Sequence, residues 1–276
     1  MTADYVLIGH ITADLTPQGR IAGGTVSYAA RTAAAFGWRV GIVTSCRPDE
    51  PLLDPFRSFA DIHIIPADET TTYENIYTDH GRLQYVRGRA GEILAENIPD
   101  KLRSAPLVHL APIADEIRSG VAAYFGESTI LATLQGWMRQ WGPDQVVHFK
   151  PFDHENLLKR VDVVVFSEED IAAAPETEAW VSARARHTFV TRAEKGGSYY
   201  HDGQHDSYTT PKVSVVEPTG AGDVFAASLL ASLPLVAYDM SKAIRIAARL
   251  AANAVTRPGI QGTPSADEVR AVLETI

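Results

Sequence analysis

The chain has 276 residues, of which 45% are hydrophobic and 21% charged, and its formal net charge is −9. This composition supports a well-buried folded domain and argues against extensive disorder. An acidic chain without any run of Lys and Arg lacks the basic face of a nucleic-acid-binding protein. No apolar run reaches the roughly 20 residues that a membrane-spanning helix needs. We therefore expect neither nucleic-acid nor membrane partners.

Two further features bear on the cellular compartment. Cys46 is the only cysteine, so no disulfide can form within the chain. The first residues lack the basic and apolar regions of a signal peptide. Because reduced thiols are typical of the cytoplasm, we expect a cytoplasmic protein.

The first part of the chain alternates short apolar runs with an alanine-rich segment. Tyr5–Gly9, Arg39–Thr44 and Ile62–Ile65 are apolar runs typical of buried parallel strands. Ser27–Phe36 is rich in alanine and ends before Gly37, which predicts a helix. The start of the chain therefore favours an α/β domain.

Residues 70–87 have a different pattern. Threonine and aromatic residues flank the turn signal Asp79-His80-Gly81, which predicts a β-hairpin. These strands are too polar for the middle of a parallel sheet. We expect residues of about 11–22 and 68–90 to form a small, half-exposed sheet that stands off the main domain as a lid.

Strands and helices alternate again after this hairpin. Short apolar strands are predicted at Leu107–Leu110, Thr129–Ala132, Val161–Phe166 and His187–Thr191, and a hairpin at Tyr199–Tyr208. Long helices are predicted at Ala221–Ser232 and Ser241–Thr256. The alternation predicts the α/β class, with one doubly wound, mostly parallel sheet in a single domain over residues 1–276 and the lid inserted in it.

The segment Glu217–Ala227 carries the clearest chemical signal. Its sequence, EPTGAGDVFAA, places a turn of small residues directly before an alanine-rich helix. Glycines let the backbone approach a ligand closely, and the free N–H groups of a helix start attract an anion. We therefore expect Gly220, Ala221 and Gly222 to form an anion hole, with Asp223 beside it in the first helical turn.

Two other interpretations of this segment remain open. Thr219 could act as the N-cap of the helix, with Asp223 placed favourably in the first turn. A dinucleotide-binding loop fits less well, because the bulky Phe225 stands where a third glycine is expected and the segment lies near the C-terminus.

The residues Gly220-Ala221-Gly222-Asp223 resemble the C-terminal signature of the ribokinase (PfkB) family of carbohydrate kinases, D-T-x-G-A-G-D. Glu217 and Pro218 replace its first Asp and Thr. The resemblance implies a ribokinase-like fold with a small β-sheet lid, and an enzyme that transfers the terminal phosphate of ATP to a hydroxyl. The resemblance also implies Mg²⁺ as a cofactor and allows a monovalent cation as a second one. Asp223 would take the hydroxyl proton, and the glycine turn would stabilise charge on the phosphoryl group.

The same resemblance extends to the N-terminal part of the chain. Asp14 matches an aspartate that binds substrate hydroxyls, and Gly23-Gly24 match a glycine pair that passes under the sugar. Tyr28 stands where the family usually has asparagine, and Arg139 is expected to contact phosphate or substrate. A solvated loop aspartate, a plain turn before the helix and an exposed arginine on a helix are the structural alternatives.

Further matches concern the metal and the nucleotide. Ser167 and Asp170 occupy the place of an N-x-x-E motif that organises magnesium, although a capping serine before an acidic first turn explains them as well. Thr191 and Gly196 match positions of a T-x-G-x-x-G nucleotide loop, or form a strand end and a glycine turn. Gly259 lies in a segment whose neighbourhood lines the adenine pocket in the family.

The pattern around Tyr28 also bears on the substrate. An aromatic residue there, the run Thr70-Thr71-Thr72 and the spacing of Gln135 and Arg139 resemble plant-type myo-inositol kinases. We therefore expect a sugar or cyclitol acceptor, with myo-inositol the leading candidate. A nucleoside or aminoimidazole-riboside kinase, a vitamin-type kinase and a non-catalytic sugar-binding relative remain alternatives. The lid strands could also pair with those of a second copy, giving a homodimer.

Overall fold

The computed structural model describes residues 2–17, 19–78, 81–118 and 120–276. Its core is a nine-stranded sheet in the order β15-β14-β13-β12-β9-β8-β1-β4-β5. Strands from β13 to β5 run parallel, and β14 and β15 are antiparallel at one edge. The strands are β1 (Tyr5–Ile8), β4 (Val40–Cys46), β5 (Ala60–Pro66), β8 (Leu107–Leu110), β9 (Thr129–Thr133), β12 (Val163–Ser167), β13 (His187–Thr191), β14 (Gly197–His201) and β15 (Gln204–Tyr208).

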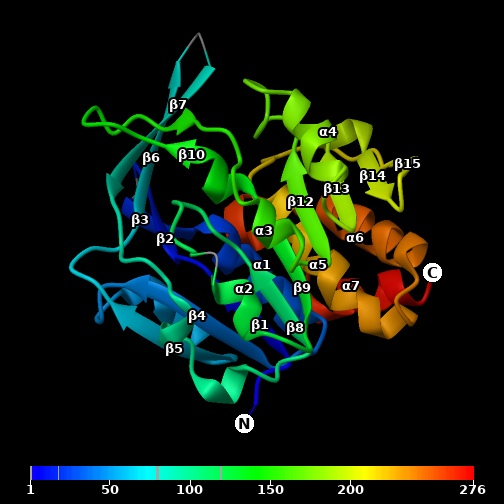
Figure 1. Ribbon diagram of the computed structural model, residues 1–276, viewed down its shortest axis with the longest axis horizontal. Helices are drawn as coiled ribbons and strands as arrows, with labels where there is room; N and C mark the ends of the chain where they lie inside the picture. Colours follow the sequence, from blue (N-terminus) through cyan, green and yellow to red (C-terminus); the bar gives the residue numbers. More distant parts are fainter. Residues whose placement is uncertain (1, 18, 79–80, 119) are drawn as a thin grey trace.

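Helices cover both faces of this sheet (Figure 1). The helices are α1 (Gly24–Ala35), α2 (Gly120–Tyr124), α3 (Glu155–Leu158), α4 (Glu176–Ser182), α5 (Ala221–Ser232), α6 (Met240–Ala254) and α7 (Ala266–Leu273). Short 3₁₀ turns are η1 (Pro51–Phe56), η2 (Ala95–Asn97), η3 (Asp100–Leu102), η4 (Gln135–Met138), η5 (Ala193–Lys195), η6 (Leu233–Val236) and η7 (Gly259–Gly262). The predicted doubly wound α/β fold is confirmed.

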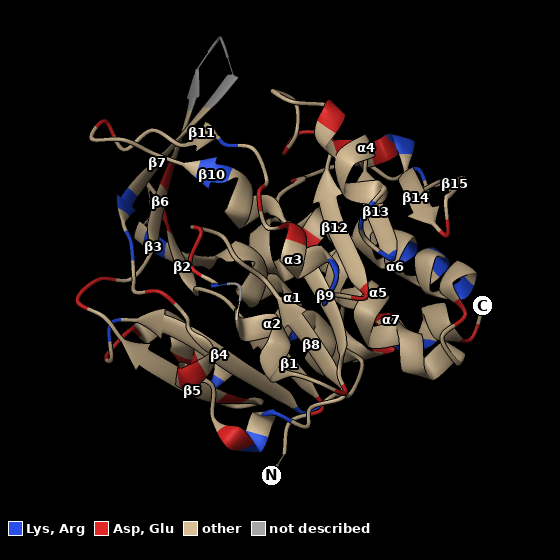
Figure 2. Ribbon diagram, viewed as in Figure 1, with Lys and Arg blue, Asp and Glu red and all other residues tan. Residues whose placement is uncertain are grey.

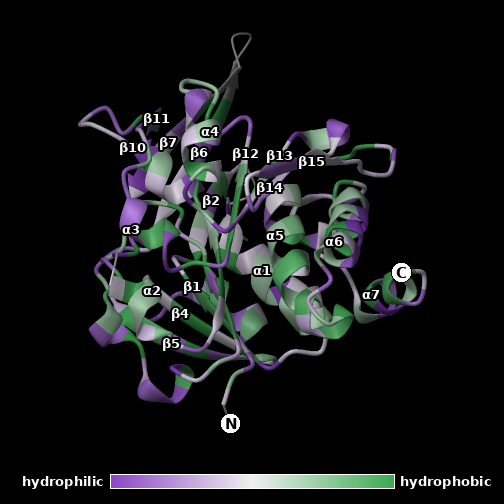
Figure 3. Cartoon of the chain, turned by 45° about the vertical axis from the view of Figure 1, so that its right-hand side comes forward, coloured by the Kyte–Doolittle hydropathy of each residue, from purple (hydrophilic) through white to green (hydrophobic). Residues whose placement is uncertain are grey.

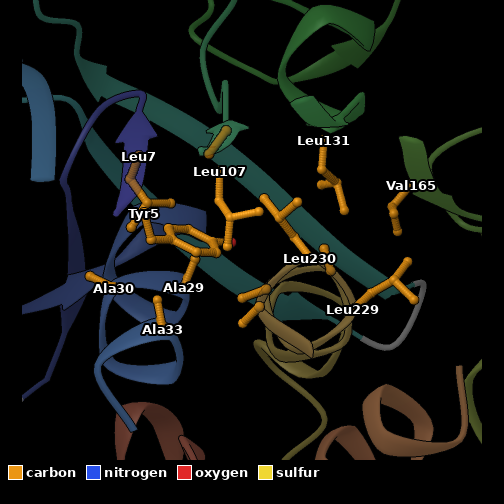
Figure 4. Packing of buried hydrophobic residues seen from close by; sticks show 14 of the residues in the cluster. Tyr5, Leu7, Ala29, Ala30, Ala33, Leu107, Leu131, Val165, Leu229 and Leu230 are labelled. Carbon is orange, nitrogen blue, oxygen red and sulfur yellow. The ribbon is translucent and has the colours of Figure 1, made fainter. Parts of the chain in front are cut away.

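The core explains why the strands are apolar on both sides. Alternate residues of each parallel strand enter two separate apolar clusters, one packed against α1, α5 and α6 and the other against α2, α3 and α4. Figure 4 shows Tyr5 and Leu7 of β1 beside the alanines of α1, with Leu229 and Leu230 of α5 in the same layer. Both leucines are fully buried, which stabilises the fold by about 1.5–3 kcal/mol each. Apolar colouring is accordingly concentrated in the central strands and in α5 (Figure 3).

A second, four-stranded sheet, here called the small sheet, stands beside the core in the order β3-β2-β6-β7. Its strands are β2 (Thr12–Thr16), β3 (Gly19–Gly23), β6 (Thr72–Thr78) and β7 (Gly81–Gly88). It is separate from the parallel sheet, as its polar sequence predicts. The predicted turn residues Asp79 and His80 lie outside the described residues.

The sequence pattern did not predict one element, a short hairpin after η4. Residues after η4 form a two-stranded hairpin, β10 (Arg139–Gln140) with β11 (His148–Phe149). The loop of this hairpin pairs with the edge of the small sheet, where the Val86 N–H donates to the Gln145 carbonyl at 2.9 Å and the Val147 N–H donates to the Gln84 carbonyl at 2.8 Å. The hairpin therefore ties the small sheet to the segment that carries Arg139.

Charged residues lie mainly in loops and on the outer helices (Figure 2). Within the described ranges, no helix is both long and apolar enough to cross a membrane.

Candidate active site

The glycine turn before α5 has the conformation that an anion hole needs. Gly220 is the N-cap residue with φ +84°, and no side chain caps the helix, so the alternative role of Thr219 as N-cap is wrong. Ala221, one of the predicted anion-hole residues, donates its N–H to the Pro218 carbonyl at 3.3 Å. Among the described residues, no acceptor is hydrogen-bonded to the N–H of Gly222 or of Asp223. These groups therefore remain available to a bound anion.

Tyr28 explains why residue 220 must be glycine. A Cβ atom at Gly220 would lie 2.2 Å from Cε1 of the Tyr28 ring. Tyr28 is only 5% exposed and packs in an apolar cluster with Val224 and Ile246. Burial, followed by the charges of Asp223, Glu217 and Asp14, raises the pKa of its hydroxyl well above the usual range. The Tyr28 side chain is therefore uncharged and packs against the glycine turn.

Asp223 is the partly buried carboxylate beside this turn. Its Oδ1 accepts a hydrogen bond of 2.7 Å from Oγ1 of Thr25. Burial raises the pKa of Asp223 to about 6, with Asp170 and Asp14 acting in the same direction and the Thr25 hydrogen bond and Arg139 opposing. The carboxylate is mostly ionised at neutral pH and is a stronger base than an exposed aspartate.

The glycine pair before α1 lies against Asp14. A Cβ atom at Gly23 would lie 2.2 Å from Oδ2 of Asp14, so the carboxylate contacts the backbone where only glycine leaves room. Gly24 has φ +77°, and a Cβ atom there would lie 2.9 Å from Oγ1 of Thr12. The close approach of the Asp14 carboxylate to Gly23 places Asp14 at the start of α1. A plain turn before the helix does not explain this contact.

Arg139 lies at the beginning of β10 and is partly buried, so the exposed helical arginine considered as an alternative is wrong. Its Nη1 donates to the carbonyl of Ile113 at 3.4 Å, and its guanidinium lies 5.6 Å from the centre of the Tyr73 ring. The Tyr73 hydroxyl donates to the same carbonyl at 2.6 Å. Because Arg139 also lowers the pKa of Asp223, its charge acts on this carboxyl group.

Four charged residues from distant segments thus converge on one place. Asp14, Arg139 and Asp170 all influence the pKa of Asp223, and they follow β1, β9 and β12 at the carboxyl ends of parallel strands. Ligands in open α/β sheets bind at this end of the strands.

Ser167 and Asp170 form a closed turn after β12, and no helix begins at these described residues, so the capping serine considered as an alternative is wrong. The N–H and hydroxyl of Ser167 both donate to Oδ2 of Asp170 at 2.8 Å, and the Asp170 N–H donates back to the Ser167 hydroxyl at 3.1 Å. Oδ1 of Asp170 accepts from the side-chain amide of Gln135 at 3.1 Å. The described part of the chain contains no group of three or more His, Cys, Asp or Glu arranged for a metal ion. The magnesium role of these two residues stays a prediction.

Thr191 and Gly196 bound a tight connection between β13 and β14. Gly196 has φ +88°, and a Cβ atom there would lie 1.9 Å from the carbonyl oxygen of Tyr208. Arg192 in this connection is held by both carboxylate oxygens of Glu178 at 2.6 Å. The geometry is that of a strand end and a glycine turn, and binding of a nucleotide here stays a prediction.

Gly259 lies beside the signature segment. Its N–H donates to Oε2 of Glu217 at 2.8 Å, so the glutamate that replaces the usual aspartate links the segment after α6 to the glycine turn. The approach of these two segments is found only in the folded chain, since they are 42 positions apart in sequence.

The sequence pattern did not predict the roles of two buried side chains that position the site. The Thr25 hydroxyl donates to the Asp223 carboxylate, and the only sequence feature that could have indicated this role is its position directly after Gly23-Gly24. Glu116 is fully buried and accepts from the N–H groups of His10, Ile113 and Ala114 at 2.7–3.1 Å. It therefore fixes the loop that presents the Ile113 carbonyl to Arg139.

Known proteins resemble this chain in sequence and in fold. Residues 145–267 match the family described as pfkB family carbohydrate kinase. A cytidine kinase of Thermococcus kodakarensis is 28% identical over 263 residues, which cover 83% of this chain and 87% of the relative. A pyrophosphate-dependent kinase in the ribokinase family, complexed with a pyrophosphate analog and myo-inositol, superposes with a TM-score of 0.80 at 20% identity over 99% of this chain and 100% of that one.

Another neighbour is the Arabidopsis thaliana ribokinase complexed with ribose and ATP. It has a TM-score of 0.75 and 18% identity, and the match covers 99% of each chain. These structures share the large, mostly parallel sheet and the smaller separate sheet. Residues 145–267 therefore resemble a PfkB family carbohydrate kinase domain, and the chain has the ribokinase-like fold. Together these matches indicate a small-molecule kinase.

Proposed function

We propose that the protein transfers the terminal phosphate of ATP to a hydroxyl of a neutral polyol or sugar, with Asp223 as the general base. The observation that carries this proposal is the position of Asp223. Its carboxylate, with a pKa raised to about 6, adjoins helix N–H groups that have no partner among the described residues. Phosphoryl transfer needs a positioned hydroxyl and stabilised charge on the phosphoryl oxygens, and these groups supply both.

Each group has a role in this reaction. Asp223 accepts the proton of the attacking hydroxyl, while the N–H groups of Gly222 and Asp223 donate to the transferred phosphoryl oxygens. Magnesium bound with ATP would neutralise charge on the donor phosphates. Since both oxygens of Asp170 already accept hydrogen bonds, Ser167 and Asp170 suit a hydrated ion held through water. Thr191, Gly196 and Gly259 are proposed to line the nucleotide side.

The charges around Asp223 favour a neutral acceptor. Asp14 can accept hydrogen bonds from substrate hydroxyls, and Gly23 lets the main chain lie close to the ring. Arg139 can donate to the remaining hydroxyl oxygens. An unmet buried polar group costs about 1–3 kcal/mol, so an acceptor without a matching hydroxyl should lose roughly ten- to a hundredfold in kcat/KM. We propose myo-inositol as the leading acceptor, and the structural neighbour solved with bound myo-inositol supports this choice.

A nucleoside is the second candidate acceptor. The cytidine kinase relative favours it, because its 28% identity exceeds that of the sugar-kinase neighbours. The non-catalytic alternative is set aside, since the family match is to kinases.

A panel of acceptors and donors tests the proposal. We expect kcat/KM for myo-inositol to exceed the values for ribose, fructose, adenosine and cytidine with Mg-ATP. If cytidine or adenosine exceeds myo-inositol by more than about tenfold, the acceptor is a nucleoside. Replacing ATP by pyrophosphate tests the donor, because one structural neighbour is described as pyrophosphate-dependent. A rate with pyrophosphate above that with ATP would overturn the donor assignment.

We also propose a homodimer formed through the small sheet. Ile76 and Leu83 face each other across β6 and β7 and are 38% and 43% exposed, and β3 is an edge strand. Light scattering after size-exclusion chromatography would measure the mass of the particle. A monomer at micromolar concentration would contradict this assembly.

A further inference from the structure

Thr25 joins the acceptor side of the site to the catalytic helix. It lies in the first turn of α1, directly after Gly23 and Gly24, and is 1% exposed. Its Oγ1 donates to Oδ1 of Asp223 at 2.7 Å. The two residues are 198 positions apart, so only the packing of α1 against α5 brings them together.

The backbone before Thr25 has little freedom. Gly24 adopts φ +77° beside Oγ1 of Thr12, and the Asp14 carboxylate lies directly against Gly23. The position of the Thr25 hydroxyl is therefore set by the residues that are proposed to hold the acceptor.

The two oxygens of Asp223 differ in their contacts. Oδ1 accepts from Thr25, whereas no hydrogen bond joins Oδ2 to any described residue. We propose that Thr25 is a positioning residue for phosphoryl transfer: its hydroxyl holds Oδ1 and leaves Oδ2 to receive the acceptor proton. This inference rests on the proposed function of Asp223 as the base.

The proton and the electrons balance in this step. The acceptor O–H bond breaks and its proton passes to Oδ2 of Asp223, while the hydroxyl oxygen bonds to the terminal phosphorus of ATP. The bond from that phosphorus to its bridging oxygen breaks, and the electron pair leaves with ADP. Thr25 exchanges no proton. Its hydrogen bond stabilises the ionised carboxylate and opposes the effect of burial on the pKa of Asp223.

The test compares Thr25→Val with Thr25→Ser. Valine removes the donor at nearly constant volume, whereas serine keeps the hydroxyl. We expect Thr25→Val to lower kcat roughly 10- to 100-fold, the loss typical of a hydrogen bond to a charged group. Without that donor the pKa of Asp223 rises, so the acid limb of the kcat–pH profile, expected at about pH 6, moves to higher pH. Thr25→Ser should restore both kcat and the limb.

Thr32→Val is the matched control. Thr32 is also buried in α1, but its hydroxyl donates to the carbonyl of Tyr28 and not to Asp223. It should keep the wild-type pH profile. KM for the acceptor and for ATP should change by less than about threefold in Thr25→Val, because a buried residue that orients the base acts on kcat. If Thr25→Val does not fold, Thr25→Ala removes the same donor and is measured instead.

Each outcome separates this inference from the function on which it rests. Wild-type kcat and an unmoved acid limb in Thr25→Val would overturn the positioning role while Asp223→Asn remains inactive. A loss in Thr25→Ser equal to that in Thr25→Val would also overturn it. If Asp223→Asn itself keeps wild-type kcat, the proposed function fails before Thr25 is considered.

Discussion

The two sides of the candidate site satisfy their polar groups in opposite ways. At the start of α5, the N–H groups of Gly222 and Asp223 have no partner within the described chain, and the N-cap Gly220 offers no side chain. At the end of β12, Ser167 and Asp170 bond to each other. A free helix start needs a ligand or water, whereas a turn whose polar groups bond to each other needs neither. The first region therefore leaves donors available to an anion, whereas the second uses its polar groups within the chain.

Asp223→Asn should have the largest effect on this contrast. Asparagine keeps the shape of the side chain and cannot accept the proton, so we expect kcat to fall by roughly 10²–10⁴ while KM for ATP changes little. Steady-state kinetics with the preferred acceptor measure it. A variant with near-wild-type kcat would show that Asp223 is not the base.

The stability of the same variant provides its control. Burial raises the pKa of Asp223 in the folded state above the ordinary 3.8, so between these pH values the native protein binds more protons than the unfolded chain. Stability is then lost as pH rises from about 4 to about 6. Asp223→Asn should therefore raise Tm by about 2–4 °C at pH 8 and give no gain at pH 4. A lower Tm at pH 8 would indicate damage to the fold.

Gly220→Ala should be the next most damaging change. Alanine disfavours φ +84°, and its Cβ would lie 2.2 Å from the Tyr28 ring, so the turn and its N–H groups must move. We expect kcat to fall roughly 10²–10³-fold, as when one oxyanion donor is lost. A Cβ at Gly222 would meet nothing within 4 Å, so Gly222→Ala should lose much less. Equal losses in the two variants would contradict the role of the Tyr28 contact.

Asp170→Asn should have a smaller effect, and it tests the region at the end of β12 where Ser167 and Asp170 bond to each other. If Asp170 organises magnesium through water, the Mg²⁺ concentration for half-maximal activity should rise roughly 10- to 100-fold. Glu169→Gln is the neighbouring control, because Glu169 is exposed and is not one of the predicted site residues. An unchanged Mg²⁺ requirement with a lower Tm would show that Ser167 and Asp170 only stabilise the turn after β12.

Local sequence was sufficient for some of these features. The apolar runs of β1, β4 and β8 are short and buried on both faces, which restricts them to a parallel sheet. The segment EPTGAGD indicated the glycine turn, since few residues other than glycine adopt φ +84° beside a ring. The polar, threonine-rich pattern of β6 likewise separated the small sheet from the core.

Other features were beyond local sequence. The β10–β11 hairpin has short strands and takes its partners from the small sheet, so its own residues carry little pattern. Glu116 looks like an ordinary surface glutamate in sequence, yet it is buried because three backbone N–H groups of two loops surround it. Such groups are recognised only when their partners are known.

The sequence by itself therefore determined the α/β class, the glycine turn before α5 and the carboxyl group of Asp223 beside that turn. These follow from local backbone preference and hydrophobic periodicity, which nearby residues encode. Only the tertiary structure decided that Thr25 holds Asp223 and that Tyr28 packs on Gly220. It also decided how far the pKa of Asp223 rises. These depend on contacts between α1 and α5, whose residues lie nearly 200 positions apart and meet only when the sheet has brought both helices to one face.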